Sequence, residues 1–181
     1  MADSGVEVFA LLRKIESRSR QKALGLPQQL EIRQTKTGIG FLLQGTSLLV
    51  ATDEVSEILP YPPLTKIPGT VRWVKGVANI RGTLIPIIDL LGFTNDEMAG
   101  VNRKSRVLVM RNGDFVSGLL VTEVLGLRHF QEEEKTTDLP PVATRLQSLL
   151  VGGYQQGDQH WGVFSTHHLA AMPEFINVAI S

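Results

Sequence analysis

The first regular pattern in the chain has the period of a helix. Ser4 and Glu7 are spaced as a capping box, in which each side chain satisfies a free backbone N–H at a helix start. An apolar stripe follows at the i, i+3, i+4 and i+7 positions Val8, Leu11, Leu12 and Ile15. We therefore predict an amphipathic helix and a polar linker over residues 1–37. Such a helix could lie on a membrane surface, on a partner protein or on the body of the same protein, and the shortness of its stripe favours the last.

From residue 38 onward the period changes to that of short strands. Apolar runs are separated by turn signals, which are Gln44-Gly45, Asn112-Gly113 and Gln156-Gly157-Asp158. Four prolines in residues 60–69 predict an extended loop. Many short strands at this spacing predict an all-β protein with minor helices, rather than alternating strands and helices.

Two segments echo each other. Residues 44–55 (QGTSLLVATDEV) and 112–124 (NGDFVSGLLVTEV) both run from a turn glycine through an apolar strand to an acidic residue and a valine. Hairpins resemble one another in general, so the echo is a weak sign of a repeat. It fits a chain folded into two similar small barrels.

The densest pattern is WVKGVANIRGTLIPIIDL, residues 73–90, which predicts a hairpin turned at Gly82-Thr83. Strand alternation places Lys75, Asn79 and Arg81 on one face together with an apolar residue, Val77. Two interpretations remain open. The face is either the solvated side of an ordinary barrel strand or a groove wall on which Arg81 presents its guanidinium to a partner.

Pro86 lies in the returning strand of the same hairpin. A proline in a sheet is tolerated at an edge or at a bulge, so we expect one of these positions here. Asp89 is expected to satisfy backbone groups near the end of the hairpin.

The sequence contains no recognisable catalytic or cofactor-binding motif. The four histidines form no H-x-x-x-H pattern, cysteine is absent, and no nucleophile elbow, phosphate-binding loop or dinucleotide fingerprint occurs. We therefore predict no catalytic residue, no metal site, no cofactor and no enzymatic activity.

Charge and hydropathy limit the classes of molecule with which the protein is expected to interact. Lysine plus arginine and aspartate plus glutamate both total 18, so no surplus of positive charge favours nucleic acid. No apolar run approaches the roughly 20 residues that cross a bilayer, and the first residues do not have the pattern of a signal peptide. We expect a cytoplasmic protein without direct membrane insertion.

The hairpin closely resembles the signature of CheW-like domains, the coupling proteins of bacterial chemosensory arrays. The matching residues are Lys75, Gly76, Asn79, Arg81, Gly82, Pro86, Asp89 and Leu90. Val55, Glu57 and Ile58 match an upstream pattern of the family, and Gly118 falls in its second-barrel hairpin. The chain departs from the family at residues 121–124, which read VTEV where V-D-x-V is common.

The resemblance covers about residues 38–172 and implies two five-stranded β-barrel subdomains, followed by a tail at 173–181. It implies a non-enzymatic adaptor that joins the cytoplasmic helical tip of a chemoreceptor to the regulatory domain of a CheA-type histidine kinase. The receptor would dock in a groove between the barrels, where the matching Arg and Glu are expected to pair. The candidate receptor-binding residues are Val55, Glu57, Ile58, Asn79, Arg81 and Val107; the structural signature residues are Gly76, Gly82, Pro86, Asp89 and Gly118.

The chain resembles one branch of this family, which serves type IV pilus systems and twitching motility. The resemblance lies in the predicted N-terminal helix, the GLPQQ junction and the sequence WVKGVANIRG. The alternative within the family is an adaptor of flagellar chemotaxis or of another two-component pathway. Outside the family, the alternatives are a small-molecule-binding barrel and an unrecognised hydrolase.

Overall fold

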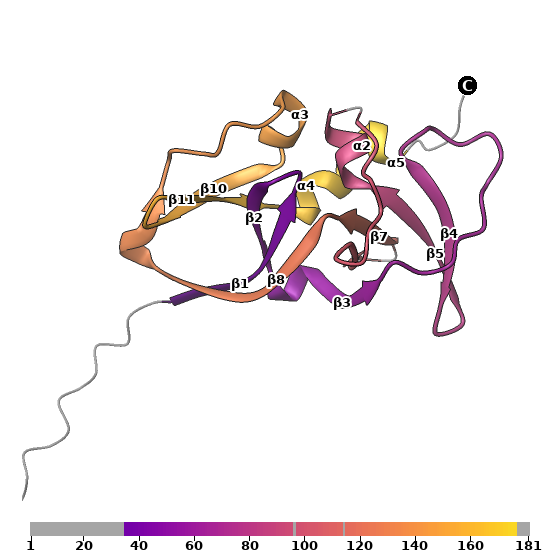
Figure 1. Cartoon of the computed structure of the whole chain (residues 1–181), viewed down its shortest axis with the longest axis horizontal. Helices are drawn as coiled ribbons and strands as arrows, with labels where there is room; N and C mark the ends of the chain where they lie inside the picture. Colours follow the sequence, from indigo (N-terminus) through magenta and orange to yellow (C-terminus); the bar gives the residue numbers. More distant parts are fainter. Residues whose placement is uncertain (1–34, 96, 114, 177–181) are drawn as a thin grey trace, which may run out of the picture. The chain divides into compact units, whose positions relative to one another are not determined.

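The computed structural model describes residues 35–95, 97–113 and 115–176, all within the compact unit Gln34–Ser181 (Figure 1). The helix predicted near the N-terminus lies outside the described residues. The predicted linker ends earlier than expected, because residues 35–37 already belong to the first strand.

The first sheet has six strands in the order β8-β1-β2-β11-β10-β9. Only β2 and β11 are parallel neighbours. The strands are β1 (Thr35–Leu43), β2 (Thr46–Ala51), β8 (Glu123–Gln131), β9 (Lys135–Thr136), β10 (Leu150–Gln156) and β11 (Gln159–Phe164).

The second sheet has five strands in the order β3-β6-β7-β5-β4, in which only β5 and β7 are parallel. The strands are β3 (Val55–Pro60), β4 (Val74–Ile80), β5 (Thr83–Asp89), β6 (Arg106–Asn112) and β7 (Phe115–Val121). The described helices are α2 (Leu90–Asn95), α3 (Thr144–Gln147), α4 (Thr166–Ala170) and α5 (Pro173–Ile176), with 3-10 turns η1 (Thr52–Glu54) and η2 (Glu132–Glu134).

The two sheets repeat one strand arrangement. Each has an edge strand (β8 or β3), an antiparallel hairpin (β1–β2 or β6–β7), a parallel step and a second hairpin (β11–β10 or β5–β4). The echoing segments 44–55 and 112–124 therefore contain β2 and β7, which hold the same place in the two sheets. The sheets also exchange strands, because β2 leads into β3 of the second sheet and β7 leads into β8 of the first.

The all-β class with minor helices is confirmed, but the two sheets are not closed five-stranded barrels. The first sheet gains a sixth strand, β9, and ends at β8 and β9; the second ends at β3 and β4. No ladder among the described strands joins these ends. The ends of the second sheet nevertheless approach each other, because Leu59 of β3 and Ile80 of β4 pack against the same buried cluster. We call the gap between them the seam.

Pro86 lies at neither an edge strand nor a bulge, because β5 is flanked by β7 and β4. It pairs with Val77, whose backbone N–H and C=O are both bonded to Thr65 on the outer side of β4. The parallel pairing of β5 with β7 begins one residue later, at Ile87. The missing N–H of proline therefore costs no ladder hydrogen bond at this position.

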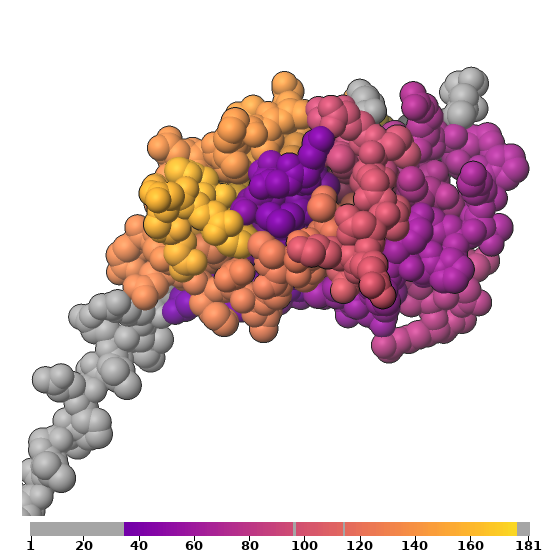
Figure 2. Space-filling view, viewed as in Figure 1, coloured from indigo at the N-terminus to yellow at the C-terminus, as the bar shows by residue number. Residues whose placement is uncertain are grey.

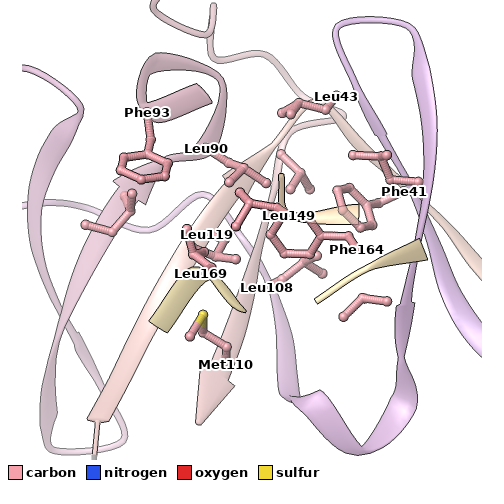
Figure 3. Close-up of a cluster of buried hydrophobic side chains, with 14 of the residues drawn as sticks. Phe41, Leu43, Leu90, Phe93, Leu108, Met110, Leu119, Leu149, Phe164 and Leu169 are labelled. Carbon is pink, nitrogen blue, oxygen red and sulfur yellow. The ribbon is translucent and has the colours of Figure 1, made fainter. Parts of the chain in front are cut away.

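One apolar core joins the sheets (Figure 3). Phe41 and Phe164 of the first sheet lie close to Leu108 and Leu119 of the second in this cluster of buried side chains. A smaller cluster lies on the other side of the second sheet, around Ile87. Because the larger cluster draws on both sheets, burial of its apolar surface holds the two sheets together.

The predicted tail is part of this core. Residues 173–176 form α5, and Phe175 is buried. Its ring stacks on Trp73 at 6.1 Å and meets Phe93 edge-on at 5.4 Å, centroid to centroid. The expected domain end at residue 172 was wrong for this reason. Pro173 occupies the first position of α5, where no intrahelical N–H is needed.

Ser117 presents an isolated polar atom inside the core. It is fully buried opposite Met110, and its hydroxyl has no hydrogen-bond partner among the described residues. We expect Ser117→Ala to raise the free energy of unfolding by about 1 kcal/mol, because the unpaired hydroxyl no longer has to be desolvated. Urea denaturation would measure the change. Ser56→Ala is the matched control: it removes a 3.0 Å hydrogen bond to the carbonyl of Val109 and should lower stability. A loss of stability in Ser117→Ala would contradict the assignment.

Candidate functional site

An ion pair crosses the seam of the second sheet. Nη2 of Arg81 donates to Oε1 of Glu57 at 2.8 Å. Glu57 belongs to β3, at one end of the sheet, whereas Arg81 lies between β4 and β5, at the other. The arginine side chain is 81% exposed and the glutamate 25%. The expected pairing of these two residues is therefore present, and most of the guanidinium remains accessible to a partner.

Arg81 is a turn residue and not part of the strand face predicted for it. Ile80 pairs with Thr83, so the turn residues are Arg81 and Gly82, one position before the predicted turn. Both have positive φ, 52° and 84°. Positive φ at both central residues is typical of the type I′ hairpin turn, which favours Asn-Gly. A left-handed conformation costs a residue with a Cβ about 1–2 kcal/mol, so Arg81 occupies a strained position.

Asn79 supports this turn. Its Oδ1 accepts a hydrogen bond from the backbone N–H of Gly82 at 2.8 Å. The hairpin tip lies at the lower right of the view, and the space-filling view shows this magenta segment at the surface (Figures 1 and 2). The side-chain oxygen of Asn79 is thus occupied by the chain itself, although the residue is exposed.

The other two polar residues of the hairpin serve the fold. Asp89 is fully buried and accepts from the N–H of Gly92 at 3.1 Å and of Ala99 at 2.9 Å. The first bond caps α2, so Asp89 satisfies backbone groups just after the hairpin. Nζ of Lys75 lies 3.9 Å from its carboxylate and supplies a counter-charge. Burial and then the charge of Asp89 raise the pKa of Tyr61.

The predicted residues on β3 are only partly brought together. Ile58 is exposed and, by strand alternation, points to the side opposite Glu57. Val55 is half-buried against the core that joins the sheets. The prediction that Val107 contacts the receptor was wrong. It is fully buried in the smaller cluster of the second sheet and has no surface to offer a partner.

The signature glycines allow close backbone and side-chain approach. A Cβ on Gly76, which has φ of 140°, would lie 2.5 Å from the carbonyl oxygen of Thr65. A Cβ on Gly118 would lie 2.6 Å from side-chain atoms of both Ile87 and Val107. A side chain at either position would therefore displace neighbouring atoms of the fold.

Leu84 was missed. It is 69% exposed and lies opposite Asn79 in the hairpin, three residues from Arg81. Within the apolar run TLIPII it resembles a core residue, but alternation from the buried Ile85 places it on the outer face. An exposed leucine beside an exposed arginine is a combination that protein interfaces use.

No described cluster of three or more histidine, aspartate or glutamate residues could hold a metal ion. Within the same residues, no helix has the length and apolar character needed to cross a membrane.

A two-sheet scaffold with an accessible charged hairpin has the features of a protein-interaction module. The chain belongs to the CheW-like domain family, whose model matches residues 37–174. It is 42% identical to Protein PilI of Pseudomonas aeruginosa over 172 residues, which span 95% of this chain and 96% of that one. This likeness confirms the resemblance to the pilus branch of the family.

Other relatives agree with this assignment. The chain is 35% identical to Protein FrzA of Myxococcus xanthus over 79 residues, covering 44% of this chain and 49% of that protein. It is 26% identical to the chemotaxis protein CheW of Helicobacter pylori over 82% of this chain and 88% of the other. The crystal structure of the scaffolding protein TtCheW from Thermoanaerobacter tengcongensis shares the fold, with a TM-score of 0.67 and 24% identity over 82% of this chain and 96% of that one. The chain is thus a CheW-like adaptor of the chemosensory class.

Proposed function

We propose that this adaptor couples the cytoplasmic tip of a chemoreceptor helical bundle to the regulatory domain of a CheA-type kinase, in a cytoplasmic array that controls type IV pilus twitching motility. The observation that carries the pathway is the similarity to PilI along almost the whole length of both chains. A coupling protein binds two partners and catalyses no reaction, and this role agrees with membership of a family of scaffold proteins.

The receptor contact is assigned to the seam of the second sheet and not to the expected groove between the two barrels, because Glu57 and Arg81 both come from the second sheet. Arg81 offers a guanidinium that is only partly used by Glu57, and guanidinium groups recognise carboxylates through paired hydrogen bonds. Leu84 adds exposed apolar surface three residues from Arg81 in the same hairpin. The receptor surface that fits is a helical face with an acidic side chain beside apolar ones.

The kinase contact is assigned to the end regions of the first sheet: the edge strand β8 at one end, and β10, next to the two-residue edge strand β9, at the other. Leu127 of β8 and Val151 of β10 are exposed apolar side chains there. The family resemblance implies that the regulatory domain of the kinase carries the same fold, so a contact between apolar edges of two similar sheets is the simplest arrangement. Separate surfaces would let one adaptor hold both partners at once.

The test uses two variants of Arg81 and the full-length chain. Arg81→Glu should weaken binding to a receptor-tip fragment by about 100-fold or more, because a repulsive charge then faces a partly desolvated carboxylate. Arg81→Asn should weaken it less, by about 10-fold. Its stability should stay within about 0.5 kcal/mol, because Asn suits the left-handed turn and the lost ion pair is exposed. Calorimetric titration measures both affinities.

Leu127→Asp is the matched control, expected to lose the kinase domain and keep the receptor fragment. Receptor affinity unchanged in Arg81→Glu would overturn the receptor assignment. A deletion strain separates the pathways: loss of twitching with normal swimming supports the pilus assignment, and the reverse supports flagellar chemotaxis.

A further inference from the structure

The left-handed turn at the hairpin tip needs an explanation, because its first residue is unsuited to it. Arginine has a Cβ and no side-chain group that bonds its own backbone, so it lacks what makes Asn favourable at this position. Yet Arg81 adopts φ of 52°. When a central residue of a type I′ turn does not favour positive φ, contacts elsewhere must hold it in that conformation.

Asn79 supplies such a contact from the strand before the turn. Its Oδ1 accepts from the N–H of Gly82, the second turn residue, at 2.8 Å. The bond spans the peptide units on both sides of Arg81, so it fixes the direction in which that residue leaves the hairpin. The closing pair of the ladder, Ile80 with Thr83, fixes the other side of the turn.

That direction matters because the partner of Arg81 lies on a distant strand. β3 and β4 are opposite ends of the second sheet, so no backbone ladder sets the distance between Glu57 and the hairpin tip. The 2.8 Å contact between the two side chains depends on where the turn aims the guanidinium. A right-handed turn of the same length would splay the hairpin and direct Arg81 elsewhere.

We propose that Asn79 is a positioning residue for Arg81: it holds the left-handed turn that lays the guanidinium across the seam, and it contributes to receptor binding only through that arginine. The binding part of this inference rests on the proposed receptor function. The alternative is a direct contact between Asn79 and the receptor, which its exposure and its neighbour Leu84 would also allow.

A double-mutant cycle distinguishes the two. The variants are Asn79→Ala, Arg81→Asn and the combination, each as the full chain, titrated with the receptor-tip fragment. Asn79→Ala alone should weaken binding about fivefold, the scale of one hydrogen bond. In the Arg81→Asn background the same change should cost less than about twofold, because Asn-Gly forms the turn unaided. Asn79→Asp keeps an acceptor for Gly82 and should retain affinity better than Asn79→Ala.

The free protein provides a second measurement that needs no partner. Backbone NMR couplings report the φ of residue 81, which should leave the left-handed region in Asn79→Ala and stay there in Asn79→Asp. Additive losses in the cycle, or an unchanged φ in Asn79→Ala, would overturn the positioning role. If Arg81→Asn and Arg81→Glu both bind normally, the receptor assignment fails instead, while the turn measurement still decides whether Asn79 holds Arg81.

Discussion

Replacing Phe175 with alanine should lower the free energy of unfolding by about 3–5 kcal/mol, the usual cost of deleting a buried aromatic ring. The ring lies in an aromatic cluster with Trp73, Phe93 and Phe115, at centroid distances of 5.4 to 6.1 Å. Neighbouring rings cannot fill the space without leaving their own contacts. Urea denaturation measures the loss, and the emission of Trp73 reports the change at the site itself.

The control for this variant is the next residue. Ile176 is exposed, so Ile176→Ala should change stability by less than about 0.5 kcal/mol. Truncation after residue 172 should resemble Phe175→Ala and not the control. A loss below about 1 kcal/mol in Phe175→Ala would show that α5 does not pack as described.

Replacing Asp89 with alanine should cost about 3 kcal/mol or more. The buried backbone N–H of Gly92 and the partly buried N–H of Ala99 lose their acceptor, and an unpaired buried group carries a penalty of roughly 1–3 kcal/mol. Lys75 also loses its counter-charge, although its partial exposure lets it turn to solvent. The measurement is again the free energy of unfolding, compared with the wild-type chain.

Asp89→Ser gives a graded comparison that the fold itself suggests. At the equivalent place in the first sheet, Ser165 caps α4 by accepting from His168 at 3.2 Å. A serine at position 89 should therefore keep the cap of α2 and lose only the bond to Ala99, at about half the cost of alanine. Equal losses in the two variants would mean that the cap contributes nothing.

Local pattern predicted much of the strand content, and the misses have physical causes. The turn Gln44-Gly45 lies where the turn residues placed it, between β1 and β2. Helix α2 was missed because five of its six residues are buried, so it shows no polar face. Arg81 was assigned to a strand because nothing local marks an arginine as a left-handed turn residue.

The site could be predicted only in part, since its geometry depends on sheet order. Glu57 and Arg81 are far apart in sequence and at opposite ends of one sheet, so periodicity alone does not bring them together. Their pairing was expected from the family resemblance. Val107 was placed at the surface for the same reason, because a matching strand does not reveal which of its residues point inward.

The exchange of strands between the sheets has a consequence for how the chain folds during synthesis. The strands of the second sheet, β3 to β7, leave the ribosome as one uninterrupted segment. Those of the first are split: β1 and β2 emerge before that segment, but their partners β8 and β11 follow it. The parallel ladder of β2 with β11, which pairs Leu48 with Gly162, cannot form until β11 has been synthesised. Both edges of the first hairpin therefore stay unpaired until β8 and β11 have been synthesised, so we expect this half to be the slower and more aggregation-prone part of the nascent protein.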